Sequence, residues 1–89
     1  MYYVYMLECA DGSLYTGWTN NLDKRIRLHN AGRGSKYVRS RLPVQMRYAE
    51  SFMTQGEAMR HEYALKQLAR NEKLALIESQ NTSLQHKDE

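Results

Sequence analysis

Five side chains of this sequence are of types that could together act on a phosphate group. Arg25 could hold a phosphate through two parallel hydrogen bonds, and Glu62 could supply one oxygen ligand to Mg²⁺. His29, four residues after Arg25, could hydrogen-bond a phosphate, orient a water molecule or pass protons. Two phenols, Tyr5 and Tyr15, could hold a water molecule between them if they share one face of a sheet. A phenol has a reference pKa of about 10, so it would act as a base only where nearby cations lowered that pKa.

Each of the five residues also has an ordinary structural explanation. Tyrosines are common in strands and cover small cores, and the chain has 7 of them. A helical histidine such as His29 is more often simply packed or exposed, and an arginine such as Arg25 more often forms a surface salt bridge. Glu62 is the exception, because a carboxylate on an inward helical stripe is costly unless it is paired or bound to a cation. A buried ion pair with an arginine and a metal ligand explain it about equally well.

The charges of the chain are distributed unevenly. The formal net charge is +3, yet residues 24–49 contain no acidic side chain. Such a one-sign block in a folded segment favours a polyanionic partner, with a solvated basic surface as the alternative. Charge alone does not distinguish DNA from RNA. We expect the basic loop to grip a nucleic-acid backbone and its tyrosine to stack on an unpaired base, through Arg33, Lys36, Tyr37, Arg39 and Arg41.

The length and composition of the chain indicate a small single-domain protein that neither crosses a membrane nor contains a disulfide. With 89 residues the chain is expected to form one domain, and no apolar run approaches the roughly 20 residues of a membrane helix. The first eight residues lack the features of a signal peptide, and Cys9 has no second cysteine with which to form a disulfide or a zinc cluster. We therefore expect a cytoplasmic protein without a membrane partner.

Alternation of side chains predicts three strands, at residues 2–7, 13–19 and 44–52. Helical periodicity predicts a first helix over residues 22–31, followed by a basic loop over residues 32–43. The first helix would be capped by Asn20 or Asn21 and ended by Gly32. The third strand is expected to present on one side Val44, Met46 and Tyr48.

Thr54 and Glu57 have capping-box spacing and predict the start of the longest helix. Its inward stripe would consist of Ala58, Glu62, Leu65 and Ala69. A short final helix is expected after Asn71. The resulting order, ββαβαα, predicts an α+β fold with a small three-stranded antiparallel sheet and flanking helices. Residues 1–78 would form the domain, and residues 79–89 a polar, disordered tail.

The turn between the first two strands has two candidate registers, which differ in where Tyr5 and Tyr15 point. A two-residue turn at residues 11–12 would put the two tyrosines on opposite faces of the sheet. A three-residue loop ending at Gly12, in left-handed conformation, would put them on one face and set Gly17 opposite Tyr5. A glycine there would leave room for a backbone phosphate to approach.

Three segments, in this order, resemble the sequence signature of the GIY-YIG nuclease superfamily. The first is similar to its paired tripeptides, the second to its first-helix arginine with a histidine four residues later, and the third to its later metal-binding helix. They span residues 3–66, and together they form a specific match, like that of small stand-alone bacterial members. The residues concerned are Tyr3-Val4-Tyr5, Tyr15-Thr16-Gly17, then Arg25 with His29, and Glu57 to Glu62 followed by Lys66.

The resemblance implies hydrolysis of DNA phosphodiester bonds with one divalent cation, Mg²⁺ or Mn²⁺. Tyr5 and Tyr15 would position or activate the water, Arg25 and His29 would stabilise the phosphate, and Glu62 would hold the metal. Because both tyrosines must then share a face, the resemblance also favours the three-residue loop.

This sequence departs from the family pattern at two positions. Tyr3 replaces the first glycine of the signature, and Trp18 stands where some members have a lysine that assists catalysis. The second departure leaves the identity of the base open, and neither removes one of the five candidate residues.

The leading hypothesis is a structure-selective DNA endonuclease linked to repair or recombination. The alternative is a catalytically silent nucleic-acid-binding module recruited by a partner protein. A purely structural domain ranks lowest, because it leaves the acid-free segment unexplained. The sequence does not specify the shape of the substrate, the general base, the pathway or the oligomeric state.

Overall fold

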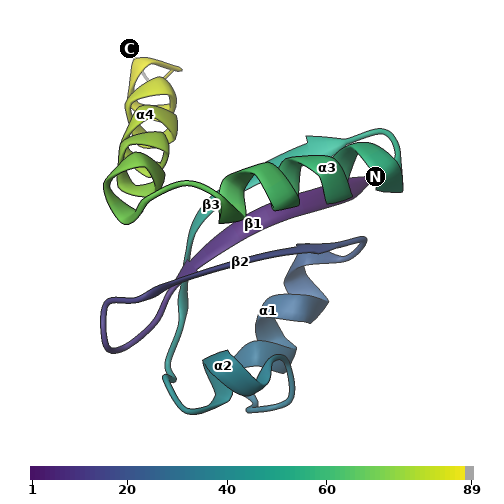
Figure 1. Ribbon diagram of the computed structural model, residues 1–89, viewed down its shortest axis with the longest axis vertical. Coiled ribbons are helices and arrows are strands. Elements are labelled where there is room, and N and C mark those ends of the chain that lie inside the picture. Colours follow the sequence, from purple (N-terminus) through teal and green to yellow (C-terminus); the bar gives the residue numbers. More distant parts are fainter. Residues whose placement is uncertain (88–89) are drawn as a thin grey trace.

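Three strands form one antiparallel sheet in the order β2-β1-β3 in the computed structural model (Figure 1), which describes the backbone of residues 1–87 and the side chains of residues 1–81. The strands are β1 (Tyr2–Glu8), β2 (Leu14–Thr19) and β3 (Gln45–Phe52). Four consecutive residues of β1, Val4 to Leu7, are fully buried. A central strand buried on both faces requires helices on both sides of the sheet, so the predicted α+β architecture is confirmed.

The hairpin between β1 and β2 has the three-residue loop. Gly12 has a φ of 84°, and the Cys9 N–H donates a hydrogen bond of 2.9 Å to the Ser13 carbonyl. Tyr5 therefore lies opposite Gly17, and Leu7 lies opposite Tyr15. Because side chains alternate along a strand, this register puts Tyr5 and Tyr15 on the same face, and the two-residue alternative is wrong.

One face of the sheet is covered by α1 (Leu22–Asn30) and α2 (Lys36–Arg39). The Asn21 side chain caps α1 by accepting a hydrogen bond from the Lys24 N–H, as one of the two predicted caps would. The short helix α2 lies within the segment predicted as a loop, and Ser35 caps it. The residues buried on this face are Tyr5, Leu7, Cys9, Val38 and Val44, packed against Tyr15, Leu22, Ile26 and Leu42.

The opposite face carries α3 (Gln55–Lys66) and α4 (Arg70–Lys87) (Figure 1). Thr54 caps α3 by accepting from the Glu57 N–H, and its hydroxyl donates to the Glu57 carboxylate, as the capping-box spacing predicted. The final helix begins at Arg70, one residue before Asn71. It has 18 residues against 12 in α3, so the prediction of a short final helix after a longest one is wrong. The cluster buried beneath these helices comprises Val4, Met6, Tyr48, Ala58, Leu65 and Ile77.

A β-bulge separates residues of β3 that were predicted to share a side. The pairing with β1 shifts between Met6, which faces Tyr48, and Leu7, which faces Met46. The extra residue inverts the alternation, so Tyr48 joins the cluster under α3 and α4 while Val44 joins the opposite cluster. The predicted single side is therefore wrong.

The helix α4 includes residues 79–87 of the segment predicted as a polar tail, while residues 88–89 lie outside the described part. The Gln80 amide accepts a 3.2 Å hydrogen bond from the Ala49 N–H and donates a 2.8 Å bond to the Ala49 carbonyl. This side chain covers backbone groups on the outer edge of β3, where a sheet is otherwise open to pairing. The boundary at residue 78 stays a prediction. Within the described residues, none of the helices has the length and apolar character to cross a membrane.

Candidate active site

Three of the predicted residues come together on the face covered by α1. The Tyr5 hydroxyl lies 2.9 Å from His29 Nε2. The ring of Tyr15 meets the His29 imidazole edge-on, with 5.4 Å between centroids, and its centroid is 6.4 Å from that of Tyr5. β1, β2 and α1 thus contribute one residue each, brought together by the register of the hairpin and the capping of α1.

Gly17 has a different role from the one predicted. A Cβ at this position would lie 2.7 Å from the Tyr5 hydroxyl oxygen and 2.9 Å from its ring. The phenol of Tyr5 therefore passes directly over Gly17 and fills the space that was expected to admit a phosphate. Gly17 is needed because any side chain would displace Tyr5.

His29 is enclosed by a residue that the sequence did not single out. A Cβ at Gly34 would lie 2.2 Å from His29 Nδ1, so the backbone of the α1–α2 connection packs onto the imidazole. His29 is 1% exposed, and its Nδ1 has no hydrogen-bond partner among the described residues. The only sequence signal for this contact is the pair of glycines on either side of Arg33.

The environment lowers the pKa of His29, because burial disfavours the charged imidazole and the nearby Arg25 adds repulsion. His29 is therefore neutral at neutral pH, and its Nε2 can accept a hydrogen bond from the Tyr5 hydroxyl. Burial also raises the pKa of Tyr5, and Tyr15 raises it further. The positive charge of Arg25 opposes this rise, whereas Glu62 adds to it. In the metal-free protein Tyr5 keeps its proton.

Arg25 and Glu62 come from helices on different sides of the sheet. Arg25 lies on α1 one turn before His29, whereas Glu62 comes from α3. Both act electrostatically on the Tyr5 hydroxyl. Tyr15 and His29 contact Tyr5 directly, whereas Arg25 and Glu62 act on it through their charges.

Glu62 has the surroundings of a carboxylate that can bind a cation. Its side chain is 19% exposed, and its Oε2 lies 3.4 Å from Lys66 Nζ, one helical turn later. The partner is thus a half-exposed lysine on the same helix and not a buried arginine. On the predicted inward stripe Ala58 and Leu65 are buried, but Ala69 is exposed because α3 ends at Lys66.

The donor set suits a cation that takes few protein ligands. No group of three or more His, Cys, Asp or Glu side chains within the described residues could hold an ion alone. Mg²⁺ commonly takes one or two carboxylates and completes its shell with water and substrate phosphate oxygens. A single half-buried carboxylate at Glu62 fits that mode of binding.

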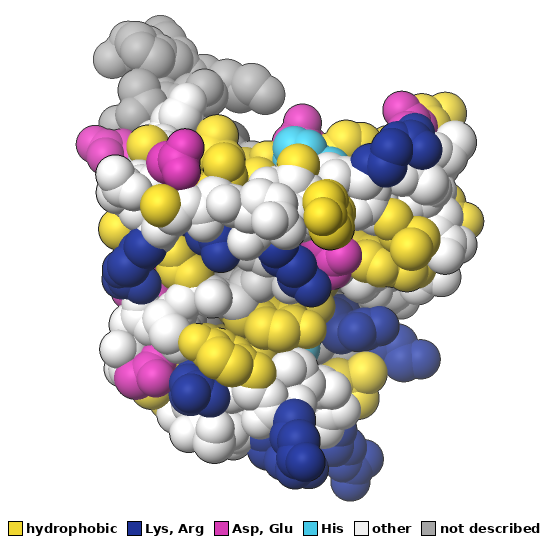
Figure 2. All heavy atoms as spheres, in the orientation of Figure 1, with side chains coloured by type: hydrophobic (Ala, Val, Ile, Leu, Met, Phe, Trp, Pro, Cys, Tyr) yellow, Lys and Arg dark blue, Asp and Glu magenta, His cyan; other side chains and the backbone are white. Residues whose placement is uncertain are grey.

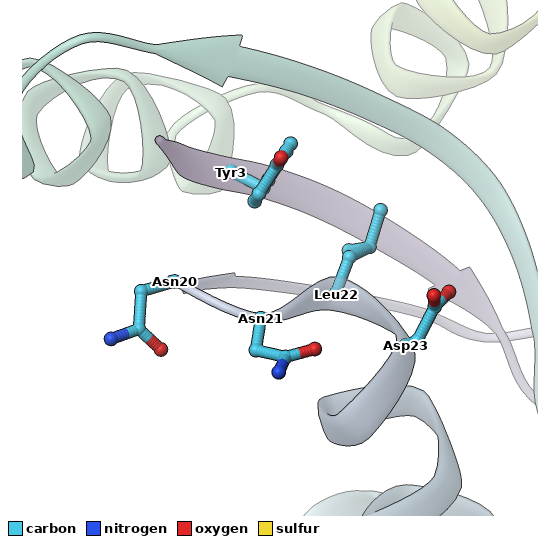
Figure 3. Close-up of a pocket in the computed structure, with 5 residues that line it drawn as sticks. All are labelled: Tyr3, Asn20, Asn21, Leu22 and Asp23. Atoms are coloured by element: carbon cyan, nitrogen blue, oxygen red, sulfur yellow. The ribbon is translucent and has the colours of Figure 1, made fainter.

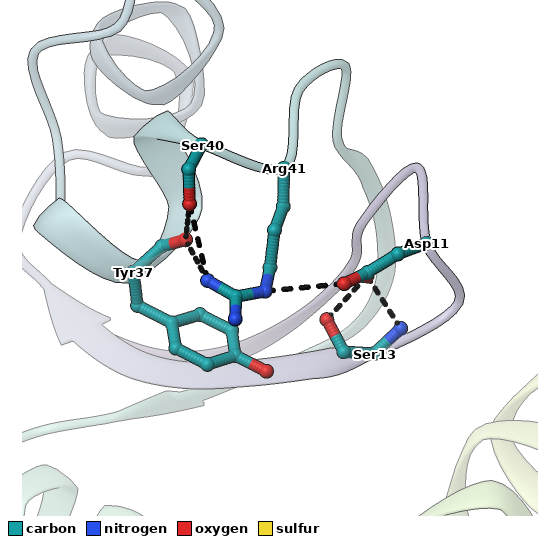
Figure 4. Close-up of polar contacts among 5 residues, drawn as sticks. All are labelled: Asp11, Ser13, Tyr37, Ser40 and Arg41. Carbon is teal, nitrogen blue, oxygen red and sulfur yellow. Dashed lines mark hydrogen bonds and ion pairs between the residues drawn. The ribbon is translucent and has the colours of Figure 1, made fainter.

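Two predicted DNA-binding residues are engaged within the protein (Figure 4). The ring of Tyr37 stacks on Tyr15 with centroids 6.2 Å apart, and the guanidinium carbon of Arg41 lies 3.9 Å from the Tyr37 centroid. Arg41 Nε donates to Asp11 at 3.1 Å, and its Nη1 donates to the Tyr37 carbonyl at 2.8 Å. Asp11 also accepts from Ser13, which with Arg41 lowers the pKa of the Asp11 carboxyl. This network joins the hairpin turn to α2 beside Tyr15.

The other predicted DNA-binding residues are free to contact a ligand. Arg33, Lys36 and Arg39 are exposed around α2. Figure 2 shows Lys and Arg side chains gathered on the end of the molecule where α1 and α2 lie. A polyanion could therefore approach the site from this end.

Two open pockets adjoin the site, and a third does not. A pocket of about 300 Å³ includes Tyr15 and Tyr37, and one of about 160 Å³ includes Arg25. A third pocket, of about 310 Å³, lies at the start of α1, where Tyr3 faces Leu22 and Asp23 across the turn at Asn20 and Asn21 (Figure 3). It includes none of the five candidate residues.

Comparison with known proteins identifies the family of the chain. Residues 1–75 match the family model described as the GIY-YIG catalytic domain. A UPF0213 protein of Clostridium perfringens is 57% identical over 81 residues, which cover 91% of this chain and 87% of that protein. A UPF0213 protein of Halobacterium salinarum is 53% identical over 77 residues, covering 86% of this chain and 100% of that protein.

A solved structure is also similar. The solution NMR structure of the UPF0213 protein BH0048 from Bacillus halodurans is 47% identical and has a TM-score of 0.57, covering 88% of this chain and 84% of that one. The family match extends over both sheet faces and includes each of the five candidate positions. The chain therefore belongs to the GIY-YIG family of nuclease domains.

Proposed function

We propose that this protein is a divalent-metal-dependent endonuclease that hydrolyses phosphodiester bonds in DNA. The observation that carries the proposal is the hydrogen-bonded contact between Tyr5 and His29 beside the ring of Tyr15, with Arg25 and Glu62 acting on the same hydroxyl. Such a buried polar pair costs stability in a small core, and a catalytic role accounts for that cost.

In the proposed reaction a water oxygen attacks phosphorus, the bond from phosphorus to the leaving oxygen breaks, and the leaving oxygen takes a proton. Arg25 would bind the phosphate and offset the negative charge that develops on it. Glu62 would hold one Mg²⁺ or Mn²⁺ ion, which when bound supplies positive charge to the phosphate.

Tyr15 and Tyr5 would orient the attacking water. Because Tyr5 keeps its proton in the metal-free protein, it is suited to hydrogen-bonding as a phenol. If Tyr5 takes a proton from the water, the neutral His29 imidazole can accept the proton that Tyr5 gives up at Nε2. The pair would thus move a proton away from the reacting centre.

The exposed basic side chains around α2 favour DNA as the substrate. Contacts with its backbone would be made by Arg33, Lys36 and Arg39, and they carry no sequence information. A domain of this size has little surface left for reading bases. We therefore propose selection by DNA structure, in repair or recombination in the cytoplasm.

The experiment incubates the protein with Mg²⁺ or Mn²⁺ and a panel of branched, flapped, nicked and single-stranded DNAs. Glu62→Gln removes the charge of the proposed metal ligand at constant shape, and Tyr15→Phe removes one hydroxyl. We expect metal-dependent cleavage that both substitutions abolish while DNA binding persists. Cleavage that survives Glu62→Gln would refute the assigned metal ligand.

A second candidate is a catalytically silent DNA-binding module recruited by a partner protein. The observation that favours it is the ion pair between Lys66 and Glu62, which occupies the proposed ligand. In the same experiment this function predicts salt-sensitive DNA binding without cleavage of any substrate in the panel.

A further inference from the structure

We propose that the pocket beside Tyr15 is a subsite for one unpaired DNA strand next to the scissile phosphate, with Lys66 and Lys73 binding its backbone. This inference rests on the proposed function, which it deepens by naming a part of the substrate and the residues that hold it. The pocket has a volume of about 300 Å³ and is lined by Leu14, Tyr15, Thr16, Tyr37, Lys66 and Lys73.

The pocket bridges the two faces of the sheet. β2 is an edge strand, because the order of strands is β2-β1-β3. Tyr15 belongs to the face of α1 and α2, whereas Lys66 and Lys73 come from α3 and α4 on the other face. A ligand in the pocket therefore crosses the edge of the sheet and reaches both the proposed catalytic tyrosine and the C-terminal helices.

The lining of the pocket matches the chemistry of a nucleotide chain. Tyr15 stacks on Tyr37 and Arg41 lies over its ring, but 41% of the Tyr37 surface stays exposed. This exposed part provides an aromatic wall beside Leu14. The two lysines provide a cationic wall, and no described carboxylate forms an ion pair with Lys73. Aromatic faces that stack bases next to cations that bind phosphates are typical of sites for unpaired strands.

Thr16 lines the pocket without exposing its hydroxyl oxygen. Thr16 is 4% exposed, and its hydroxyl oxygen is buried without a hydrogen-bond partner in the described part of the chain. Tyr15 belongs both to the candidate active site and to the pocket. An unpaired strand bound in the pocket would therefore lie immediately beside the proposed reaction.

The basic loop alone did not suggest this subsite. Lys66 and Lys73 lie in a part of the sequence where acidic and basic residues are mixed, so they do not belong to a continuous basic segment. Only the packing of α3 against β2, with α4 following α3, brings the two lysines to Tyr15.

The experiment measures binding of a fluorescent single-stranded oligonucleotide in EDTA over a series of salt concentrations, for Lys66→Gln, Lys73→Gln and the double variant. The matched controls are Arg60→Gln on α3 and Arg70→Gln on α4, which remove the same charge from exposed positions outside the pocket. Circular dichroism verifies that each variant folds. A duplex of the same sequence is measured in parallel.

We expect each lysine substitution to weaken single-strand binding roughly three- to fivefold, and each arginine control to change it by less than about twofold. The slope of log affinity against log salt should become shallower by roughly 0.7 for each lysine removed. The affinity for the duplex should change less than the affinity for the single strand.

Equal losses for the lysine variants and the arginine controls would overturn the subsite, because net charge would then explain the binding. Equal losses for single strand and duplex would overturn its preference for an unpaired strand. Since binding is measured without metal, a lysine-specific loss in a protein that cleaves nothing would retain the subsite and reject the nuclease. If the protein cleaves DNA but the lysine variants bind the single strand as well as the arginine controls do, the nuclease is retained and the subsite is rejected.

Discussion

The face of the sheet under α3 and α4 buries a mainly apolar cluster, whereas the face under α1 and α2 buries Tyr5 hydrogen-bonded to His29. Apolar burial contributes roughly 25 cal/mol per Å² to stability, so the first face is suited to holding the fold together. A buried polar pair contributes little and costs more when one of its atoms is unpaired, as His29 Nδ1 is among the described residues. The cluster buried under α3 and α4 thus stabilises the sheet, although these helices also carry Glu62 and the two pocket lysines at their surface. The face under α1 and α2 holds the Tyr5–His29 pair, which can move protons.

Substitution of Arg25 should have the largest effect on the proposed reaction. We expect Arg25→Ala to lower the rate of DNA cleavage about 10²–10³-fold, because it removes the cation nearest the developing charge. The free energy of unfolding should change by less than about 1 kcal/mol, since Arg25 belongs to neither buried cluster. Single-turnover cleavage and urea denaturation measure the two quantities. The control is Arg27→Ala on the exposed side of α1, and an equal loss of activity there would contradict the role of Arg25.

Substitution of Leu65 should show the opposite pattern. Leu65 is 4% exposed in the cluster under α3 and α4, and Leu65→Ala should lower the free energy of unfolding by about 2–5 kcal/mol. Tyr63, which is 68% exposed on the same helix, supplies the control Tyr63→Ala. Below the melting transition the rate of cleavage per folded molecule should match the wild type. A loss of activity beyond the unfolded fraction would show that the two faces are not separable.

Gly34→Ala should damage the site through the position of His29. The added methyl would lie 2.2 Å from Nδ1, so the imidazole must shift and its contact with Tyr5 is disturbed. We expect cleavage to fall by roughly tenfold or more, because small displacements of catalytic groups are costly. The imidazole signals of His29 in NMR spectra should shift in the variant.

The control for this prediction is Gly56→Ala, within α3, where the nearest atom to an added methyl is the end of the Arg60 side chain at 3.5 Å. This substitution should stabilise the protein by about 0.5–1 kcal/mol, since alanine favours a helix over glycine. An unchanged His29 spectrum in Gly34→Ala would be inconsistent with the close packing of the loop on the imidazole.

The smallest expected effect is a pH dependence of stability due to His29. Burial, and then Arg25, lower the pKa of His29 in the folded protein below its usual value of about 6.5. The unfolded chain therefore binds a proton at a higher pH than the folded chain does, and stability falls as the pH decreases through about 6.5. Urea denaturation between pH 8 and pH 5 should show this decrease. His29→Gln should reduce it, and an identical slope in both proteins would contradict a neutral, buried imidazole.

Local signals predicted the features in which neighbouring residues decide the conformation. Asn21 and Thr54 begin the helices that they were expected to cap, and the loop that ends at Gly12 sets the register. This register then determines the face on which Tyr5 and Tyr15 lie. Each of these depends on a hydrogen bond or a backbone angle within a few residues of the chain.

Other features could not be predicted because they depend on contacts between distant segments. The bulge in β3 places Tyr48 and Val44 in different clusters, on opposite faces of the sheet. Gly34 touches His29 only after the α1–α2 connection folds over the imidazole. Because these contacts cannot be seen in the sequence, alternation wrongly placed Tyr48 and Val44 on the same side of β3. For the same reason Gly17 was expected to admit a phosphate, whereas it makes room for the Tyr5 phenol.

The sequence by itself indicated which five side chains could form a site and left two registers for the turn, between which the family resemblance favoured the three-residue loop. The tertiary structure decided what surrounds them: the phenol of Tyr5 fills the space over Gly17, Tyr37 stacks on Tyr15, and two lysines from the opposite face reach the same sheet edge. The physical reason is the distance along the chain over which the interactions act. Caps and turns are local and can be read along the chain, whereas packing and electrostatic effects act between segments that only folding brings together.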